Sequence, residues 1–190
     1  MQSTLVRHAA HVLLQGGVIA YPTEGVYGLG CLPDYRESVQ HILNLKGRSV
    51  SAGLILIAAD SEQLQDWIAP TAAERKRLEK KSSQPVTWLV TAREHTPGWL
   101  TGGHNTLAVR ITRHPVAAAL CRAADSPLVS TSANRSGRPP ARTALQARRW
   151  LGNELDAVVA GPLGDASGPS EIRMAQDNRV IRAAAAAQPR

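Results

Sequence analysis

The chain has 190 residues, of which 43% are hydrophobic, a size and composition that suit one globular domain, with two small domains as the alternative. Its two cysteines cannot build a disulfide framework and no apolar stretch reaches the length of a membrane span, so we expect a cytoplasmic protein that does not bind membranes. The formal net charge of +7 favours acidic partners such as nucleotides or nucleic acids, although a charge that only keeps the protein in solution is the alternative.

The first third of the sequence predicts helices that alternate with short strands. Apolar residues recur at helical spacing over 3–15, and two glycines follow that end this helix. Asp34 is expected to cap a second helix that runs to about Lys46. Around these helices we expect a short strand stopped by a proline, then a glycine-rich turn and a buried strand, over 18–21, 22–31 and 53–59.

The rest of the sequence predicts a similar mixture. Helices are expected from Ser61 and over 71–81, 114–124 and 143–150, the last with Thr143 as its cap. Strands are expected over 85–92, 107–111, 128–131, 156–160, 170–173 and 179–182. The order is not a strict alternation, so the predicted fold is a single α/β domain, 1–190, with one twisted mixed sheet covered by helices. We expect a mobile loop over 161–169 and a frayed tail over 184–190.

Two cations follow the second predicted helix. Lys46 and Arg48 stand two positions apart in the string LKGR, where both side chains can reach one anion. Such a pair neutralises a triphosphate and stabilises the charge on a departing pyrophosphate. The alternative is a helix end that carries cations because the helix dipole favours them there.

Small polar residues follow the strand predicted over 128–131. This strand ends in hydroxyls and an amide, which come from Ser130, Thr131, Ser132 and Asn134. Open α/β sheets bind ligands at such strand ends, whereas turn formation is the alternative for the same residue types. The string PTEG, which begins at Pro22, is a third candidate, because glycines there let the backbone approach a ligand or simply form a turn.

The charge distribution and the motifs that are absent limit the ligands and reactions that the sequence predicts. Eight arginines lie between Arg110 and Arg149 against one acid, Asp125, and guanidinium groups suit phosphate. His8 and His11 share a helix face without a third ligand, so no metal site is predicted in the protein itself. The sequence contains no GxSxG string of a serine hydrolase and no acid pair that suggests glycoside hydrolysis.

Seven strings together carry a resemblance to a known family. They are YPTEGVYGLGC, LKGR, GLILIAA, PVTWLV, LAVRITRHP, PLVSTSANRSGRPP and PSEIR, and they occur in the order that is typical of the YrdC-type family, in particular of its short bacterial form. The match runs from about residue 5 to 183. The resemblance implies a YrdC-like twisted sheet with a basic concave face. It implies an enzyme that joins L-threonine, bicarbonate and ATP, which carries Mg²⁺, into threonylcarbamoyl-adenylate and releases pyrophosphate.

The resemblance also implies partners. Other proteins of the threonylcarbamoyladenosine pathway would move the threonylcarbamoyl group to adenosine 37 of tRNAs that read ANN codons. A monomer is expected, and the sequence leaves open whether tRNA touches the basic face of this chain. Two alternatives remain open, a non-catalytic RNA-binding factor and a YciO-like paralogue with weak or different activity. The strings SAN and PSEIR argue against the paralogue.

The resemblance assigns roles to single residues. The family's KxR and SxN motifs, which would hold the phosphates and the developing charge in catalysis, fall on Lys46, Arg48, Ser132 and Asn134. The L-threonine site would contain Thr23, Ser130 and Ser170. Further nucleotide contacts would come from Thr87, Arg110 and Arg182.

The chain departs from the family pattern in two places. The family usually has a proline after KGR and a lysine or asparagine just before the next strand, but this chain has Ser49 and Ala52. One nucleotide contact is therefore expected to be missing. Where the family has WPGPVT, this chain reads SSQPVT from Ser82 to Thr87, which is expected to loosen that rim of the site. Both departures are expected to affect affinity more than the type of reaction.

Overall fold

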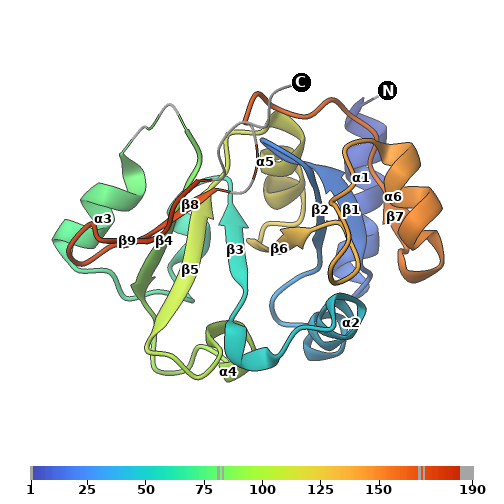
Figure 1. Ribbon diagram of the computed structural model, residues 1–190. Coiled ribbons are helices and arrows are strands. Elements are labelled where there is room, and N and C mark those ends of the chain that lie inside the picture. The colour runs from blue at the N-terminus through green and yellow to red at the C-terminus, as the bar shows by residue number, and fades with distance from the viewer. Residues whose placement is uncertain (1, 81, 83, 167, 169, 185–190) are drawn as a thin grey trace.

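The computed structural model describes residues 2–80, 82, 84–166, 168 and 170–184 (Figure 1). Within these residues, nine strands form one sheet in the order β7-β1-β2-β6-β3-β5-β4-β8-β9. They are β1 (Ile19–Pro22), β2 (Tyr27–Gly30), β3 (Ile55–Ala58), β4 (Val86–Thr91), β5 (Thr106–Ile111), β6 (Leu128–Ser132), β7 (Ala157–Val158), β8 (Glu171–Met174) and β9 (Val180–Arg182). Parallel pairing joins β1 to β7, β3 to β5 and β4 to β8, and antiparallel pairing joins the other neighbours. The predicted mixed sheet is confirmed.

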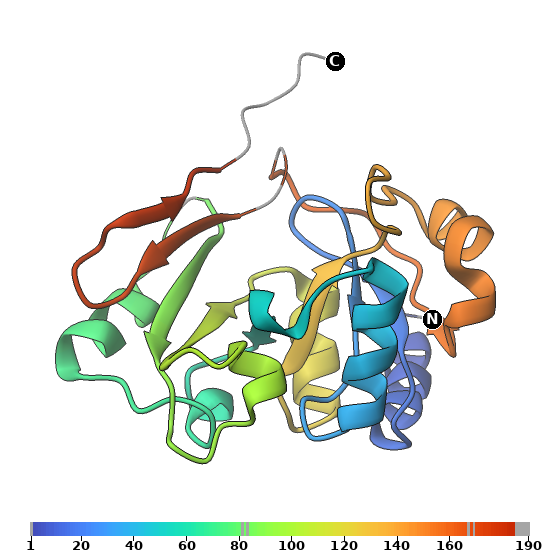
Figure 2. The ribbon, with the colours of Figure 1, turned by 60° about the horizontal axis from the view of Figure 1, so that its bottom comes forward.

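Helices cover both faces of this sheet (Figure 1). The α-helices are α1 (Gln2–Leu14), α2 (Arg36–Lys46), α3 (Ala72–Glu79), α4 (Gly98–Thr101), α5 (Pro115–Ala123) and α6 (Ala144–Leu151), and short 3₁₀-helices are η1 (Val50–Ala52), η2 (Glu62–Leu64) and η3 (Gly152–Glu154). Helices α1 and α5 pack together over Ile57 of β3, whereas α2 and α3 belong to the core that contains Leu56 on the other face. Figure 2 shows the β8–β9 hairpin at the edge of the sheet, beyond β4.

The glycine-rich segment that was predicted as a turn contains a strand, β2. This strand pairs with β1 on one side and with β6 on the other. A Cβ atom on Gly30 would lie 2.6 Å from the carbonyl oxygen of Val129 and 2.8 Å from the ring of Tyr21. The glycine is therefore required by the close packing of two neighbouring strands and a buried aromatic ring, and it does not mark a turn.

Helix starts were predicted with mixed success. Thr143 caps α6 as expected, since its hydroxyl accepts a hydrogen bond from the backbone N–H of Gln146. The predicted cap of α2 is wrong, because α2 begins after Tyr35 without any side-chain cap. Asp34 instead lines a cavity together with Asp66, and burial followed by the charge of Asp66 raises the pKa of Asp34. Helix α4 was not expected from the sequence.

The predicted mobile loop over 161–169 is bound to the first hairpin in its described part. The backbone N–H groups of Gly164 and Ala166 donate to the carbonyl oxygens of Thr23 and Glu24, at 3.0 and 2.9 Å. Residues 167 and 169 lie outside the described residues, and so do residues 185–190, which make up all but the first residue of the predicted frayed tail. Across the described ranges, we find no helix whose length and apolar character would let it cross a membrane.

Candidate active site

The register of the central strands places two predicted site residues on one face of the sheet. Arg110 of β5 pairs with Ile57 of β3, and Ser130 of β6 pairs with Ile55 of the same strand. Ile55 and Ile57 are two positions apart and point to the same side. Arg110 and Ser130 therefore share a face, although they lie on different strands on either side of β3.

The edge strands bring two further predicted residues to that face. Thr87 of β4 and Arg182 of β9 both pair with Ile172 of β8, so their side chains share a side. Trp88 pairs with Val109 of β5, and this pair points to the opposite face. Thr87 therefore lies on the same face as the arginine of β5, and this face carries predicted site residues from four strands, β4, β5, β6 and β9.

Lys46, at the C-terminal end of α2, reaches the end of β6. Its ammonium donates to the carbonyl oxygen of Ser132 at 2.8 Å, to the hydroxyl of Ser132 at 3.2 Å and to the amide oxygen of Asn134 at 2.6 Å. Gly47 ends the helix in the left-handed region, with φ 54°. The lysine of the KxR motif and both residues of the SxN motif thus form one hydrogen-bonded cluster.

Further hydrogen bonds fix the side chain of Asn134 in this cluster. The amide oxygen of Asn134 also accepts from the hydroxyl of Ser132 at 2.7 Å, and its amide nitrogen donates to the carbonyl oxygens of Arg135 and Arg138. An ammonium carries three protons, so the contacts of Lys46 use all of them. These residues hold the C-terminal end of α2, the end of β6 and the segment after β6 in one arrangement.

The electrostatic surroundings of Lys46 are unusual for a lysine. Its side chain is half-buried, and burial followed by the charge of Arg48 lowers the pKa of Lys46 to about 8. An anion bound beside the ammonium would favour its charged form and raise this pKa again. The protonation of Lys46 is therefore coupled to any anion that binds at this cluster.

The guanidinium group of Arg182 is affected by the charges of two other arginines. Arg182 donates to the carbonyl oxygen of Ser170 at 2.9 Å, and burial, followed by the charges of Arg48 and Arg110, lowers the pKa of Arg182 even though much of its surface is exposed. Arg48 donates to the carbonyl oxygen of Ala52 at 3.1 Å. Ala52, predicted as a missing contact, thus holds this arginine through its backbone.

Thr87 and Ser170 contact each other directly. Their hydroxyl oxygens lie 2.7 Å apart, and both residues are buried. Because Arg182 donates to the carbonyl oxygen of the same serine, this bond ties β4 and the start of β8 to the guanidinium of β9. Ser170 was assigned to threonine and Thr87 to the nucleotide, and the structure places both in one hydrogen-bonded unit.

Thr23 and Ser130 lie on opposite sides of Gly28. A Cβ atom on Gly28 would lie 3.1 Å from the methyl carbon of Thr23 and 3.5 Å from the hydroxyl of Ser130. The hydroxyl of Thr23 donates to the carbonyl oxygen of Val26 at 2.7 Å. The glycine of β2 therefore brings together two residues that the resemblance assigns to the threonine site.

Glu24 is part of this region, although it was not among the predicted site residues. One carboxylate oxygen accepts from the hydroxyl of Thr112 at 2.6 Å and from the N–H of Arg113 at 3.2 Å, and the other lies 3.5 Å from the guanidinium of Arg110. Burial alone would raise the pKa of Glu24, but Arg110 and the Thr112 hydroxyl outweigh it and the pKa is lowered. The only signal in the sequence was its place in the PTEG string, beside Thr23.

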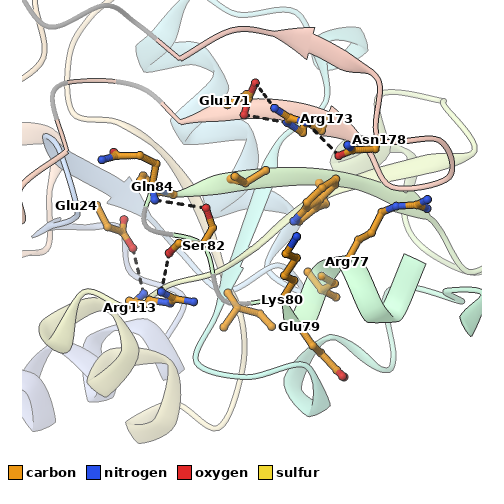
Figure 3. A pocket seen from close by; sticks show the side chains of 15 residues that line it. Glu24, Arg77, Glu79, Lys80, Ser82, Gln84, Arg113, Glu171, Arg173 and Asn178 are labelled. Carbon is orange, nitrogen blue, oxygen red and sulfur yellow. Dashed lines mark hydrogen bonds and ion pairs between the residues drawn. The ribbon is translucent and has the colours of Figure 1, made fainter. Parts of the chain in front are cut away.

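Two cavities lie away from this cluster. One, of about 460 Å³, is lined by Trp88, Arg173 and Glu171 on the opposite side of the sheet and reaches Glu24 at its rim (Figure 3). The other, of about 760 Å³, lies where β6 begins, and its lining includes five acidic residues together with Arg122. The arginines between positions 110 and 149 therefore do not form a single basic face.

Fold and site together define a class of protein. It is an α/β protein with a mixed sheet, in which cationic and hydroxyl side chains lie at strand ends and on the strands at one edge. A model of the family Sua5_yciO_yrdC, described as telomere recombination, matches residues 11–184. The chain belongs to this family, and the resemblance inferred from its sequence strings is confirmed.

Two similar sequences carry the same name. A relative from Nitrosococcus oceani named threonylcarbamoyl-AMP synthase is 56% identical over 178 residues, which cover 93% of this chain and 96% of the relative. A relative of the same name from Halorhodospira halophila is 50% identical over 93% of each chain.

Solved structures agree with the fold. P. abyssi Sua5 complexed with L-threonine superposes with a TM-score of 0.82 at 30% identity over 89% of this chain, which spans half the length of that protein. E. coli YciO superposes with a TM-score of 0.80 at 23% identity over 95% of this chain and 89% of that chain, and supports the fold alone.

Proposed function

We propose that this chain is a threonylcarbamoyl-AMP synthase, a nucleotidyltransferase that makes threonylcarbamoyl-adenylate and pyrophosphate from L-threonine, bicarbonate and ATP. One observation carries the proposal: the cluster of Lys46, Ser132 and Asn134 lies intact in a chain that is 56% identical to a relative of that name. This similarity extends over nearly the whole chain and favours the synthase over a non-catalytic RNA-binding factor.

The proposed reaction needs no nucleophilic side chain. Bicarbonate takes up a proton and loses water to give CO₂, and the amine nitrogen of threonine then forms a bond to the carbon of CO₂ while one N–H proton is released to solvent, which gives the carbamate. An oxygen of the resulting carbamate then attacks the α-phosphorus of ATP, and the bond from that phosphorus to the bridging oxygen breaks, so pyrophosphate leaves with its electron pair. Positioning and charge neutralisation account for catalysis of such a step.

The cations are proposed to bind the phosphates. Arg110 and Arg182 share a face of the sheet, the charge of Arg48 also acts on Arg182, and the planar donors of all three suit phosphate oxygens. Lys46 adds a fourth positive charge at the end of β6, next to the hydroxyl of Ser132. These charges would stabilise the negative charge that develops on the departing pyrophosphate.

Threonine is proposed to bind beside these cations, where Thr23, Ser130 and Ser170 lie around the glycine of β2 and the start of β8. The similar P. abyssi Sua5 structure is a complex with L-threonine, which supports threonine as a substrate here. Thr23 and Ser130 flank the space above Gly28. In this proposal threonine would lie on the face of the sheet that carries Ser130 and Arg110.

Mg²⁺ is proposed to arrive with ATP, held by the phosphate oxygens. Across the described part of the chain, His, Cys, Asp and Glu form no group of three or more that suits a metal ion. The carboxylate of Glu24 is already paired with Arg110. The residues present therefore do not fit a resident metal, and no step of the proposed reaction depends on one held by the protein.

The proposed function is tested by threonine-dependent pyrophosphate release. The purified protein is incubated with ATP, Mg²⁺, bicarbonate and threonine, and pyrophosphate is measured with a coupled pyrophosphatase. Release that requires both threonine and bicarbonate is expected. Lack of release, together with tight and salt-sensitive binding of tRNA, would favour the RNA-binding factor instead.

Transfer to tRNA is proposed to involve other proteins of the threonylcarbamoyladenosine pathway, with this chain acting as a monomer in the cytoplasm. Direct contact with tRNA is proposed for the arginines around α6, because Arg135, Arg138, Arg142 and Arg149 are exposed there. Arg110 is mostly buried and Arg122 lies by the acidic cavity at the other end of β6, so neither is included.

A further inference from the structure

Arg48 of the KxR motif is held in the structure by a short 3₁₀-helix. The segment that joins α2 to β3 contains η1, and the guanidinium of Arg48 donates to the carbonyl oxygen of Ala52, the last residue of η1, at 3.1 Å. Arg48 is exposed, and within the described residues its side chain makes no other hydrogen bond or ion pair. The orientation of this guanidinium therefore depends on where η1 lies.

Side-chain burial does not fix the position of η1. None of its three residues is buried, and Val50 is 37% exposed. Ser49 caps the 3₁₀-helix, because its hydroxyl accepts a hydrogen bond from the N–H of Ser51 at 3.2 Å, but this contact lies within the segment itself. Contacts with another part of the chain must therefore hold η1 in place.

The C-terminal end of α4 supplies these contacts. Helix α4 lies beside the segment between α2 and β3 (Figures 1 and 2). The carbonyl oxygen of Leu100 accepts from the N–H of Leu54, just after η1, at 2.8 Å. The carbonyl oxygen of Thr101 lies 3.2 Å from the place that a Cβ atom on Gly53 would take. The backbones of the two turns are therefore in direct contact.

Gly102, the residue that follows α4, packs against η1 itself. Its φ of 71° is in the left-handed region, and its N–H donates to the carbonyl oxygen of Gly98 at 2.8 Å, which ends the helix. A Cβ atom on Gly102 would lie 2.6 Å from the carbonyl oxygen of Ser51 and 2.7 Å from the backbone nitrogen of Gly53. Because both are backbone atoms, no rotation of a side chain can make room, and a larger residue here must displace η1.

We infer that Gly102 is a positioning residue, which holds η1, and through the carbonyl of Ala52 the guanidinium of Arg48, where that arginine meets the phosphates of the nucleotide. The inference rests on the proposed function for the identity of the anion. Gly102 touches no reactant in this role. Its lack of a side chain allows the close approach of two backbone segments, and this contact sets the direction of a cation in the site.

The test is the variant Gly102→Ala. Dissociation constants for ATP and for inorganic tripolyphosphate are measured by titration calorimetry, and kcat and KM by pyrophosphate release. We expect the dissociation constants of both polyanions and the KM for ATP to rise about tenfold, as for the loss of one hydrogen bond to a charged group, while the KM for threonine changes little. Unchanged polyanion affinity in the folded variant would overturn the inference.

The neighbouring glycine provides a matched control. Gly103 also has a left-handed φ, 82°, but a Cβ atom there would meet nothing within 4 Å. Gly103→Ala therefore introduces the same kind of backbone strain without displacing η1. Both variants should lower the melting temperature, but only Gly102→Ala should weaken polyanion binding. An equal loss of affinity in the two variants would assign the effect to strain in the turn and would overturn the inference.

A double-mutant cycle tests whether Gly102 acts through Arg48. Arg48→Met and the double variant Gly102→Ala/Arg48→Met are compared with each single variant. If the glycine acts through the arginine, its replacement has almost no further effect on tripolyphosphate affinity once Arg48 is gone. Losses that add in full would show that Gly102 acts by another route, and the inference would be overturned.

Ser49→Ala is used should Gly102→Ala fail to fold. Ser49 is exposed, so removing its hydroxyl loosens the cap of η1 without a clash. A loss of polyanion affinity of about threefold is expected, as for a weakened helix cap, and it should disappear in the Arg48→Met background. Wild-type affinity in Ser49→Ala, or a loss that persists without Arg48, would overturn the inference.

The two proposals fail in different ways. If the wild-type protein releases no pyrophosphate, but tripolyphosphate affinity falls in Gly102→Ala and not in Gly103→Ala, the proposed reaction is wrong and the positioning role stands. If the wild-type protein is active and Gly102→Ala changes only the KM for threonine, the proposed reaction stands and the inference is overturned.

Discussion

The ammonium nitrogen of Lys46 lies 2.6 Å from the amide oxygen of Asn134, although 88 positions separate the two residues in the chain. One residue ends helix α2 and the other follows strand β6. The contact joins two motifs that are unrelated in sequence position into one cationic cluster. The position of the ammonium is set by these hydrogen bonds, and its charge should affect both turnover and the pH dependence of ATP binding.

Replacing Lys46 by alanine should lower turnover strongly without unfolding the protein. The change removes one positive charge from the proposed phosphate site, and a loss of about a hundredfold or more in kcat/KM is expected for such an electrostatic group. The acceptors left behind are half-buried and can hydrogen-bond to water, so the melting temperature should change little. Lys80→Ala, at an exposed lysine outside the cluster, is the control. Wild-type turnover in Lys46→Ala would refute the assigned role.

ATP affinity should fall as the pH rises through about 8. The pKa of Lys46 is lowered to about 8 from its ordinary value of 10.5, so the ammonium that attracts phosphate is lost above this pH. Binding ATP near pH 8 should therefore take up protons, which calorimetry in buffers of different ionisation enthalpy can measure. Proton uptake that is unchanged in Lys46→Met would assign the effect to another group.

The stability of the ligand-free protein should have the opposite pH dependence. Between about pH 8 and 10.5 the unfolded chain holds a proton on Lys46 that the folded chain has released. Because the unfolded state then binds more protons, this residue makes the free energy of unfolding rise with pH across that window. Below pH 8 both states are protonated, and the cost of burying the charge is fully present. Urea unfolding of wild type and Lys46→Met across this range measures the difference, and parallel curves would contradict the prediction.

Two glycines of β2 should respond differently to alanine. On Gly30 a methyl group would clash with the carbonyl of Val129 at 2.6 Å, so Gly30→Ala should lose about 1–3 kcal/mol of stability, as overpacked cores do. On Gly28 the methyl would enter the space between Thr23 and Ser130, so Gly28→Ala should mainly raise the KM for threonine. Thermal unfolding and steady-state kinetics on both variants check the contrast. Equal effects on threonine binding would contradict the placement of the threonine site.

The hydroxyl pair of Thr87 and Ser170 should contribute to stability as a unit. Thr87→Val keeps the shape of the side chain and removes the 2.7 Å hydrogen bond inside the protein. A loss of about 1–2 kcal/mol is expected, since the remaining hydroxyl is left buried. Ser170→Ala in the Thr87→Val background should then cost less than it does alone. Fully additive losses in urea unfolding would show that the two hydroxyls are not coupled.

Much of the fold was predictable because short-range patterns mark it. The helix over 143–150 with its Thr143 cap and the buried strand over 53–59 follow from periodicity and capping chemistry, and both are present. Strand β2 was missed because its glycines are explained only by Tyr21 and Val129, which lie on other strands. Local patterns cannot report such a long-range packing requirement.

The candidate site, too, was predictable from the sequence only in part. The two motifs that contain Lys46 and Asn134 were identified from sequence, but their direct contact depends on how α2 and β6 meet. Glu24 was passed over because nothing local distinguishes it from an exposed glutamate in a loop. Its burial and its pairing with Arg110 arise only when the first hairpin packs against the end of β5.

The most direct test of the proposed function is detection of its product. Purified protein is incubated with ATP, Mg²⁺, threonine and carbon-13 bicarbonate, and the mixture is quenched and analysed by mass spectrometry. The proposed reaction predicts threonylcarbamoyl-adenylate that carries the labelled carbon, formed in step with pyrophosphate and absent with Lys46→Ala. Pyrophosphate without a labelled adenylate, or no turnover in the wild-type protein, would contradict it.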